Sequence, residues 1–213
     1  MMDVEAIWQA SVNKMPFTFF VAENLLQPAD LAALQEDFPR IEQPGTFPLQ
    51  ELEYGPAFSR LIEQVRSRDF MYVVGKKLQI NLTTKPLFVS VRGHSRPTDG
   101  QIHTDSRSRA VSCALFLNDD WQEEGGRLRM LRSPCSYSRA YTEVAPHGGA
   151  FVALKRSDRS WHGHLPYEGP RRCLLLNWMW SRPVREVERV RHRLSARVKR
   201  RIGSSGRETQ SVI

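Results

Sequence analysis

The chain has 213 residues, of which 40% are hydrophobic and 25% are charged, as in an ordinary soluble globular protein. This length accommodates one domain with a sizeable core, and no apolar run reaches the ~20 residues of a membrane helix. The N-terminus lacks the basic and apolar regions of a signal peptide, so we expect a cytoplasmic protein. The three cysteines include no CxxC pair, so the sequence suggests neither a disulfide framework nor a zinc knuckle.

The positive charge lies mainly near the C-terminus. Of the net charge of +8, residues 182–201 contribute nine Lys or Arg against two Glu, so the rest of the chain is close to neutral. Val and Leu recur in this segment every three or four residues, which predicts a basic amphipathic helix over residues 182–202. The polar residues 203–213 are typical of a disordered tail.

The N-terminal part of the chain has mainly helical periodicity. Apolar residues recur at helical spacing in four segments, and a run of aromatic and β-branched residues predicts one strand. The predicted helices cover residues 4–12, 28–38, 58–65 and 70–78, and the strand covers residues 17–21. Residues 39–56 are rich in Pro and Gly, which indicates a loop with at most a short strand.

After residue 80 the pattern changes to short apolar strands separated by turn residues. The predicted strands cover residues 87–91, 111–117, 127–131, 141–145, 150–154 and 173–180. Many short strands at regular spacing favour a β-sandwich or barrel. Because the helices come first and the strands later, we predict an α+β fold that is mainly β.

The strongest chemical signal is the tripeptide His103-Thr104-Asp105. Side chains at positions i and i+2 lie on the same side of an extended strand, so an imidazole and a carboxylate can reach one metal ion. A second histidine, His162, follows 59 residues after His103, and Arg171 and Arg172 come shortly afterwards. Two histidines and one carboxylate leave open metal positions and are typical of non-haem Fe(II) oxygenases.

The order of these residues resembles the 2-oxoglutarate/Fe(II)-dependent oxygenase superfamily, in its prolyl-4-hydroxylase-like branch. The family pattern is His-x-Asp, about sixty residues, His, about ten residues and Arg, and the resemblance covers residues 17–181. The intervening hairpin is also similar to that of the family, with Leu115-Phe116-Leu117-Asn118, Trp121 and Glu124-Gly125-Gly126-Arg127-Leu128.

The resemblance implies a double-stranded β-helix, or jelly roll, flanked by N-terminal helices, with residues 1–181 as the oxygenase domain. It implies that His103, Asp105 and His162 bind Fe(II) and that an arginine binds the far carboxylate of 2-oxoglutarate, to which its planar fork is suited. It further implies O2 as co-substrate, ascorbate as an optional stimulant, and hydroxylation with release of succinate and CO2. The substrate is left open among protein side chains, small molecules and sugars.

Two site assignments have alternatives. His162 is favoured over His164 as the distal ligand because Trp161-His162 matches the family position. Arg172 is favoured over Arg171 because it lies six residues before Trp178, as in the family, and alternation places both on one face. Residues that we expect to line the pocket are Arg92, Gln101, His164 and Trp178.

Other classes of function compete with the oxygenase. The basic helix 182–202 suggests a protein that binds nucleic acid or another acidic partner on a jelly-roll scaffold, or one that contacts a membrane surface. The same two histidines and carboxylate are also suited to a zinc hydrolase. A jelly roll that has lost its metal is a further reading, against which the intact motif argues. The oligomeric state is not indicated by the sequence.

Overall fold

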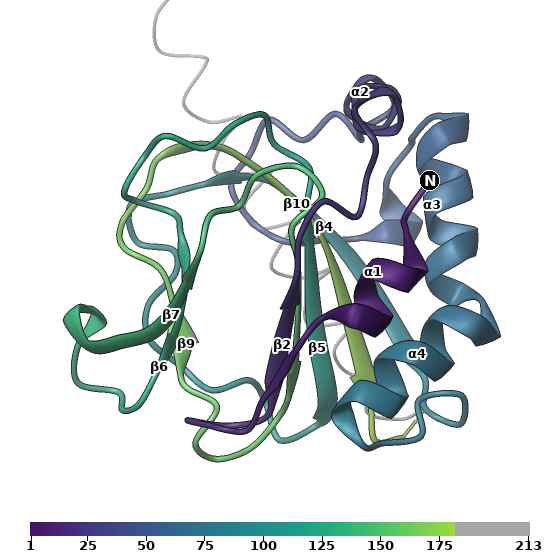
Figure 1. The fold of residues 1–213 in the computed structure, drawn as a ribbon. Coiled ribbons are helices and arrows are strands. Elements are labelled where there is room, and N and C mark those ends of the chain that lie inside the picture. The colour runs from purple at the N-terminus through teal and green to yellow at the C-terminus, as the bar shows by residue number, and fades with distance from the viewer. Residues whose placement is uncertain (182–213) are drawn as a thin grey trace, which may run out of the picture.

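The computed structural model of the chain describes residues 1–181, which form two antiparallel sheets with helices on one side (Figure 1). The predicted basic helix 182–202 and the tail 203–213 lie outside the described residues. The helices are α1 (Val4–Gln9), α2 (Pro28–Glu36), α3 (Pro56–Arg66) and α4 (Arg68–Leu78). They precede most of the strands, so the expected mainly β member of the α+β class is confirmed.

The larger sheet contains seven strands in the order β1-β2-β8-β5-β10-β4-β3. Its strands are β1 (Val12–Asn13), β2 (Phe19–Ala22), β3 (Phe47–Pro48), β4 (Leu87–Ser95), β5 (Arg109–Phe116), β8 (Phe151–Lys155) and β10 (Gly169–Met179). The smaller sheet contains β7 (Ala140–Val144), β6 (Leu128–Leu131) and β9 (His162–Gly163), in that order. The two sheets face each other in Figure 1, which is the arrangement of a jelly roll.

The predicted helices and strands are present, with their ends shifted by a few residues. The N-terminal helix is shorter than predicted because Val12 and Asn13 pair with Phe20 and Phe19 as strand β1. Strand β9 was not predicted, since two residues are too few to show an alternating pattern. The loop at residues 39–56 contains the short β3 and a 3-10 helix at Leu49–Glu51, and a second 3-10 helix lies at Tyr137–Arg139.

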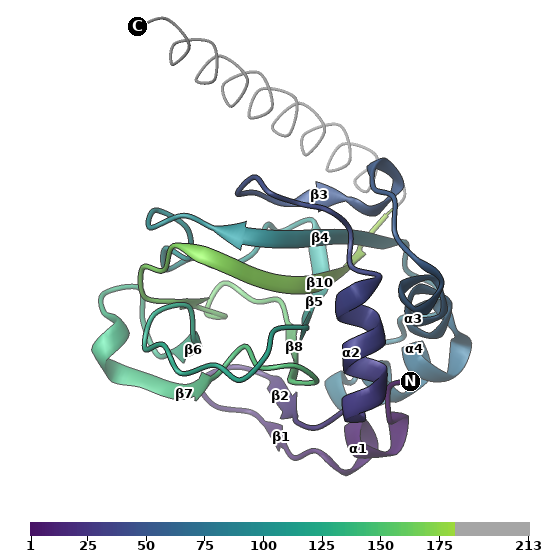
Figure 2. The same cartoon turned by 90° about the horizontal axis from the view of Figure 1, so that it is seen from above.

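The helices cover the outer face of the larger sheet, as both Figure 1 and Figure 2 show. Helix α3 buries the apolar residues that predicted it, among them Phe58, Leu61 and Val65. In α4, the ring of Phe70 lies 5.9 Å from that of Phe151 and 6.4 Å from that of Trp178. No helix within residues 1–181 is long and apolar enough to cross a membrane.

Strand β10 has one face toward the helices and one toward the smaller sheet. Leu174, Leu176 and Trp178 belong to the core that the sheet shares with the helices. Cys173, Leu175 and Asn177 line the space between the two sheets. This alternation decides which side chains of the strand can reach a site inside the jelly roll.

A second, smaller core fills part of the space between the sheets. It consists of buried side chains from both sheets, among them Phe19, Phe116, Met130 and Val152. The rest of that space is a cavity, in which the candidate site lies.

Candidate metal centre and its cavity

The space between the sheets is a cavity of about 730 Å³, a volume typical of small-molecule sites. Its lining includes His103, Asp105, His162 and His164 together with Arg109. Strand β8 contributes only apolar side chains to the wall and β4 only polar ones, whereas β5 and β10 contribute both kinds. The predicted ligand residues therefore meet inside the jelly roll.

Backbone pairing brings the two predicted histidine ligands together. The amide of His103 donates to the carbonyl of His162 at 3.0 Å, and the amide of His162 donates to the carbonyl of His103 at 2.9 Å. Their ring centroids are 4.4 Å apart. This antiparallel bridge makes neighbours of two residues that are far apart in the sequence.

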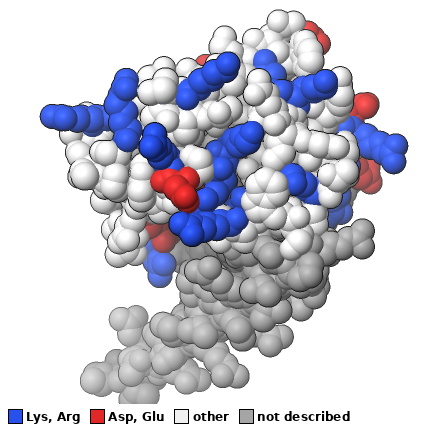
Figure 3. Space-filling model, turned by 90° about the horizontal axis from the view of Figure 1, so that it is seen from below, with Lys and Arg blue, Asp and Glu red and all other residues white. Residues whose placement is uncertain are grey.

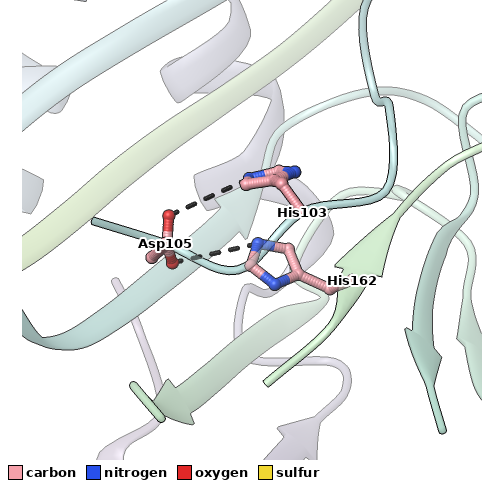
Figure 4. Close-up of side chains that lie close together, drawn as sticks. All are labelled: His103, Asp105 and His162. Atoms are coloured by element: carbon pink, nitrogen blue, oxygen red, sulfur yellow. Dashed lines mark ion pairs between the residues drawn. The ribbon is translucent and has the colours of Figure 1, made fainter. Parts of the chain in front are cut away.

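Asp105 completes a cluster of three possible metal ligands (Figure 4). One ligand atom from each of His103, Asp105 and His162 lies within 4.8 Å of the others. The Nε2 atom of His103 is 4.0 Å from Oδ1 of Asp105, and that of His162 is 3.8 Å from Oδ2. These separations suit three ligands around one ion, since His and carboxylate ligands lie about 2.0–2.2 Å from a metal such as zinc.

Backbone carbonyls fix the orientation of both imidazoles. The Nδ1 atom of His103 is 2.8 Å from the carbonyl oxygen of Gln101, and that of His162 is 2.9 Å from the carbonyl oxygen of Ser160. Because a carbonyl can only accept, each Nδ1 carries the proton and donates it. The lone pair of each Nε2 then faces Asp105, which is the tautomer that a metal ligand requires.

Asp105 is 7% exposed and is held from two directions. The Arg109 guanidinium donates to its Oδ1 at 2.6 Å, and Arg156 Nε donates to its backbone carbonyl at 3.1 Å. Burial raises the pKa of Asp105, but Arg109 and His162 outweigh this and hold the pKa below its usual range. The carboxylate is therefore charged at neutral pH.

Burial has the opposite effect on His162, whose pKa it lowers below the usual histidine value. A neutral imidazole beside a charged carboxylate is the protonation state in which these groups bind a divalent cation. Two imidazoles and one carboxylate that leave cavity-facing positions open fit Fe(II) in an oxygenase. The same donors also fit catalytic zinc.

The two candidate arginines for 2-oxoglutarate lie on opposite faces of β10. Arg171 is 5% exposed, lines the cavity, and donates from Nε to the Gly126 carbonyl at 2.9 Å. Arg172 lies over the ring of Phe38, 5.4 Å from its centroid, on the side of the helices. The preference for Arg172 was therefore wrong about which arginine faces the cavity, because the alternative, Arg171, lines it.

This correction has a simple cause. Alternation from Trp178 does place Arg172 on the same face as Trp178, as expected. That face packs against the helices, however, and Trp178 lies in the helix-facing core rather than in the cavity. Burial lowers the pKa of Arg171 to about 10, so it still carries its charge at neutral pH.

The other predicted pocket residues divide between inside and outside. Arg92 and His164 line the cavity. The His164 Nδ1 lies 2.8 Å from the Leu165 carbonyl oxygen, and burial, with a smaller effect of Arg171, lowers the pKa of His164 to about 4. The side chain of Gln101 is exposed and absent from the lining, so its predicted role was wrong.

Sequence reasoning missed several polar residues of the cavity. Arg109, Ser90 and Asn177 line it, and no motif pointed to them. The available signal was alternation: Asn177 has the same parity as Arg171 in β10, and Arg109 lies four residues after Asp105. Alternation identifies these residues only when it is known which face of each strand points into the cavity.

A comparison with protein families finds one match. Residues 92–180, which contain the His-x-Asp motif, His162 and both arginines, match the sequence model of the 2OG-Fe(II) oxygenase superfamily. Comparison with curated protein sequences finds no match.

Several solved structures share this fold, among them the following three. A prolyl-4-hydroxylase from Pseudomonas putida has a TM-score of 0.51 at 20% identity, covering 84% of this chain and 97% of that chain. EvdO2 from Micromonospora carbonacea var. aurantiaca, complexed with 2-oxoglutarate, has 0.53 at 13% identity, covering 84% and 90%. HygX from Streptomyces hygroscopicus, with nickel and 2-oxoglutarate bound, has 0.51 at 14% identity, covering 76% and 81%. At these identities the likeness establishes the fold.

Proposed function

Because residues 92–180 match the model of the 2OG-Fe(II) oxygenase superfamily, we propose that the chain is a member and that His103, Asp105 and His162 bind Fe(II) in a 2-oxoglutarate-dependent hydroxylase. The observation that carries the proposal is the convergence of two Nε2 atoms and a carboxylate within 4.8 Å, with both Nδ1 atoms tied to carbonyls. We further infer that residues 1–181 form the catalytic domain, since all of these groups lie within it.

Arg171 is our candidate for the far carboxylate of 2-oxoglutarate. Arg171 lies near the start of β10 and lines the cavity, as His164 does. Asn177 lines the cavity six residues further along the same strand. Its guanidinium lies over the Phe116 ring, 5.1 Å from the centroid, and its Nε is already hydrogen-bonded to Gly126. The remaining N–H groups form the fork that pairs with a carboxylate.

The residues of this chain have separate tasks in the proposed reaction. Iron with 2-oxoglutarate and O2 supplies the oxidation of a substrate C–H bond, with release of succinate and CO2. The carbonyls of Gln101 and Ser160 keep the two imidazoles in the ligating tautomer, and Arg109 orients the Asp105 carboxylate. The apolar wall, which includes Val152 and Leu154, limits water beside the reacting carbon.

The proposal is tested by turnover of 2-oxoglutarate without a known substrate. Metal-free protein is supplied with 2-oxoglutarate, O2 and either Fe(II) or Zn(II), and succinate is measured. We expect slow succinate formation with Fe(II) alone, abolished by His162→Ala and retained in the matched control His147→Ala. Succinate formation that survives His162→Ala, or hydrolytic activity with Zn(II) and none with Fe(II), would contradict the proposal.

A further inference from the structure

Two loops border the metal centre and are joined to each other. The first follows Asp105 and runs to Arg109, and the second follows β8 and covers residues 156–159. Arg156 Nε donates to the carbonyl of Asp105, and the Arg156 amide donates to the carbonyl of Ala110 at 3.1 Å. Since the side chain of His103 is 52% exposed, the metal centre lies near the opening that these loops border.

Four arginines lie on these loops, and we call Arg107, Arg109, Arg156 and Arg159 the arginine rim. Arg109 lines the cavity itself. Figure 3 shows the molecule from the side on which the loops lie in Figure 1, and Lys and Arg outnumber Asp and Glu on that face. The rim therefore places cationic side chains from the surface down to the metal centre.

The carboxylates nearby do not balance this charge. Asp158 is 67% exposed and is shared by Arg107 at 3.5 Å and Arg156 at 2.7 Å. Asp105 pairs with Arg109, but in the proposed function its charge is also shared with iron. Among the described residues, the Arg159 guanidinium has no ion-pair or hydrogen-bond partner.

The co-substrate does not account for the rim. In the proposed function the C1 carboxylate of 2-oxoglutarate binds the metal and its far carboxylate pairs with Arg171, so both of its charges are already compensated. Asp158 joins the two loops through Arg107 and Arg156, and Arg109 orients Asp105, which leaves Arg159 without a carboxylate partner among the described residues. The four arginines of the rim therefore face only two carboxylates. This surplus charge lies on the two loops that adjoin Asp105 and the exposed His103.

We propose that the substrate is a small organic anion whose carboxylate or phosphate group binds the arginine rim, which places a neighbouring carbon at the metal centre. This inference rests on the proposed function. Guanidinium groups bind carboxylate and phosphate by paired hydrogen bonds, and a cavity of about 730 Å³ suits a small molecule beside 2-oxoglutarate. A rim of like charge also concentrates anions at the opening and speeds their binding.

The test measures anion binding to the metal-free protein, because phosphate would otherwise bind iron directly. Inorganic phosphate and acetate are titrated at constant ionic strength by calorimetry into the wild type, Arg107→Gln/Arg159→Gln, and the control Arg60→Gln/Arg66→Gln on α3. We expect millimolar binding that the rim substitutions weaken roughly three- to tenfold and the control leaves unchanged. Arg171→Gln is included to subtract binding at the far end of the cavity.

The outcomes separate the two claims. Tighter binding of phosphate indicates a phosphate ester as substrate, tighter binding of acetate indicates a carboxylic acid, and both support the rim as the anion site. No binding by the wild type, or equal binding by the rim variant, overturns the inference and indicates a merely solvated surface. Failure of the proposed function would appear separately, as a loss of iron-dependent succinate formation in wild-type protein.

Discussion

At the residue scale, the imidazoles of the metal centre are oriented by backbone carbonyls and not by side-chain carboxylates. The carbonyls of Gln101 and Ser160 each lie two residues before the histidine that they orient. The local chain path therefore sets both tautomers. The only carboxylate beside the two Nε2 atoms in the described chain is that of Asp105, whose orientation depends on Arg109.

Substitution of the two neighbouring arginines of β10 should affect the binding of 2-oxoglutarate differently. Arg171→Gln removes a buried charge from the cavity, and we expect the dissociation constant of 2-oxoglutarate to rise at least about tenfold. Arg172→Gln changes a side chain on the opposite face and should change it by no more than about twofold. Calorimetric titration of 2-oxoglutarate into Mn(II)-loaded protein measures both. The reverse ranking would restore Arg172 to the site.

The buried His164 should make the stability of the metal-free protein sensitive to mild acid. Its folded-state pKa is about 4 against an ordinary value of 6.5, so the unfolded chain takes up the proton first. The free energy of unfolding should therefore fall as pH drops below 6.5 and level off near 4. By linkage this group accounts for about 2 kcal/mol of loss between pH 7 and pH 5. Urea unfolding at both pH values should show a smaller loss in His164→Gln; equal losses in the two proteins would exclude this cause.

The cluster of His103, Asp105 and His162 could be predicted from the sequence, but which arginine faces the cavity could not be. His103, Asp105 and His162 have fixed spacing and residue types whose chemistry is informative without a structure. Arg171 and Arg172 are adjacent and identical in type, so only the face of β10 distinguishes them. That face depends on which side of the sheet the helices cover, and the register of β10 against β4 also shifts between Pro170 and Cys173.

At the scale of elements, the two-residue strand β9 carries more of the site than its length suggests. Its residue His162 pairs with His103 on one side and with Met130 of β6 on the other. The next residue, Gly163, packs against the carbonyl of Gly100, and a Cβ there would lie 2.5 Å from that oxygen. Side-chain periodicity gives no sign of such a short strand.

Gly163→Ala should therefore damage the metal centre without changing a ligand. The added methyl group must displace the backbone at Gly100, which also accepts the His164 amide at 2.8 Å. We expect the affinity for Mn(II), followed by electron paramagnetic resonance, to fall at least about tenfold because the pairing that aligns His162 is strained. Wild-type affinity in this variant would show that β9 tolerates the shift.

The helical layer should contribute stability and leave cofactor binding intact. Phe70 of α4 is fully buried against Phe151 and Trp178. Phe70→Ala should lower the free energy of unfolding by about 3–5 kcal/mol, the usual cost of deleting a buried aromatic ring. Denaturant titration measures the loss, and 2-oxoglutarate affinity of the folded protein should stay within about twofold of wild type. A large loss of affinity would mean that the helices shape the cavity directly.

At the scale of the whole molecule, the division of the larger sheet into two faces explains both stability and site. One face binds the helices through a continuous apolar core, and the other faces the smaller sheet, where a second core leaves room for the cavity. Periodicity is a local property, and it predicted that helices precede strands. The jelly roll was predicted from the family resemblance. Which strands face each other depends on long-range pairing, such as that of β2 with β8, which no local pattern reports.

The most direct test of the account is an anaerobic titration of the metal-free protein with Fe(II) and 2-oxoglutarate, followed by the visible metal-to-ligand charge-transfer band. The account predicts a band at one iron per chain in wild type, no band in His103→Ala, and a band that needs more 2-oxoglutarate in Arg171→Gln. Wild-type protein that binds iron without developing the band would show that 2-oxoglutarate does not chelate the metal. That result would contradict the proposed function at its centre.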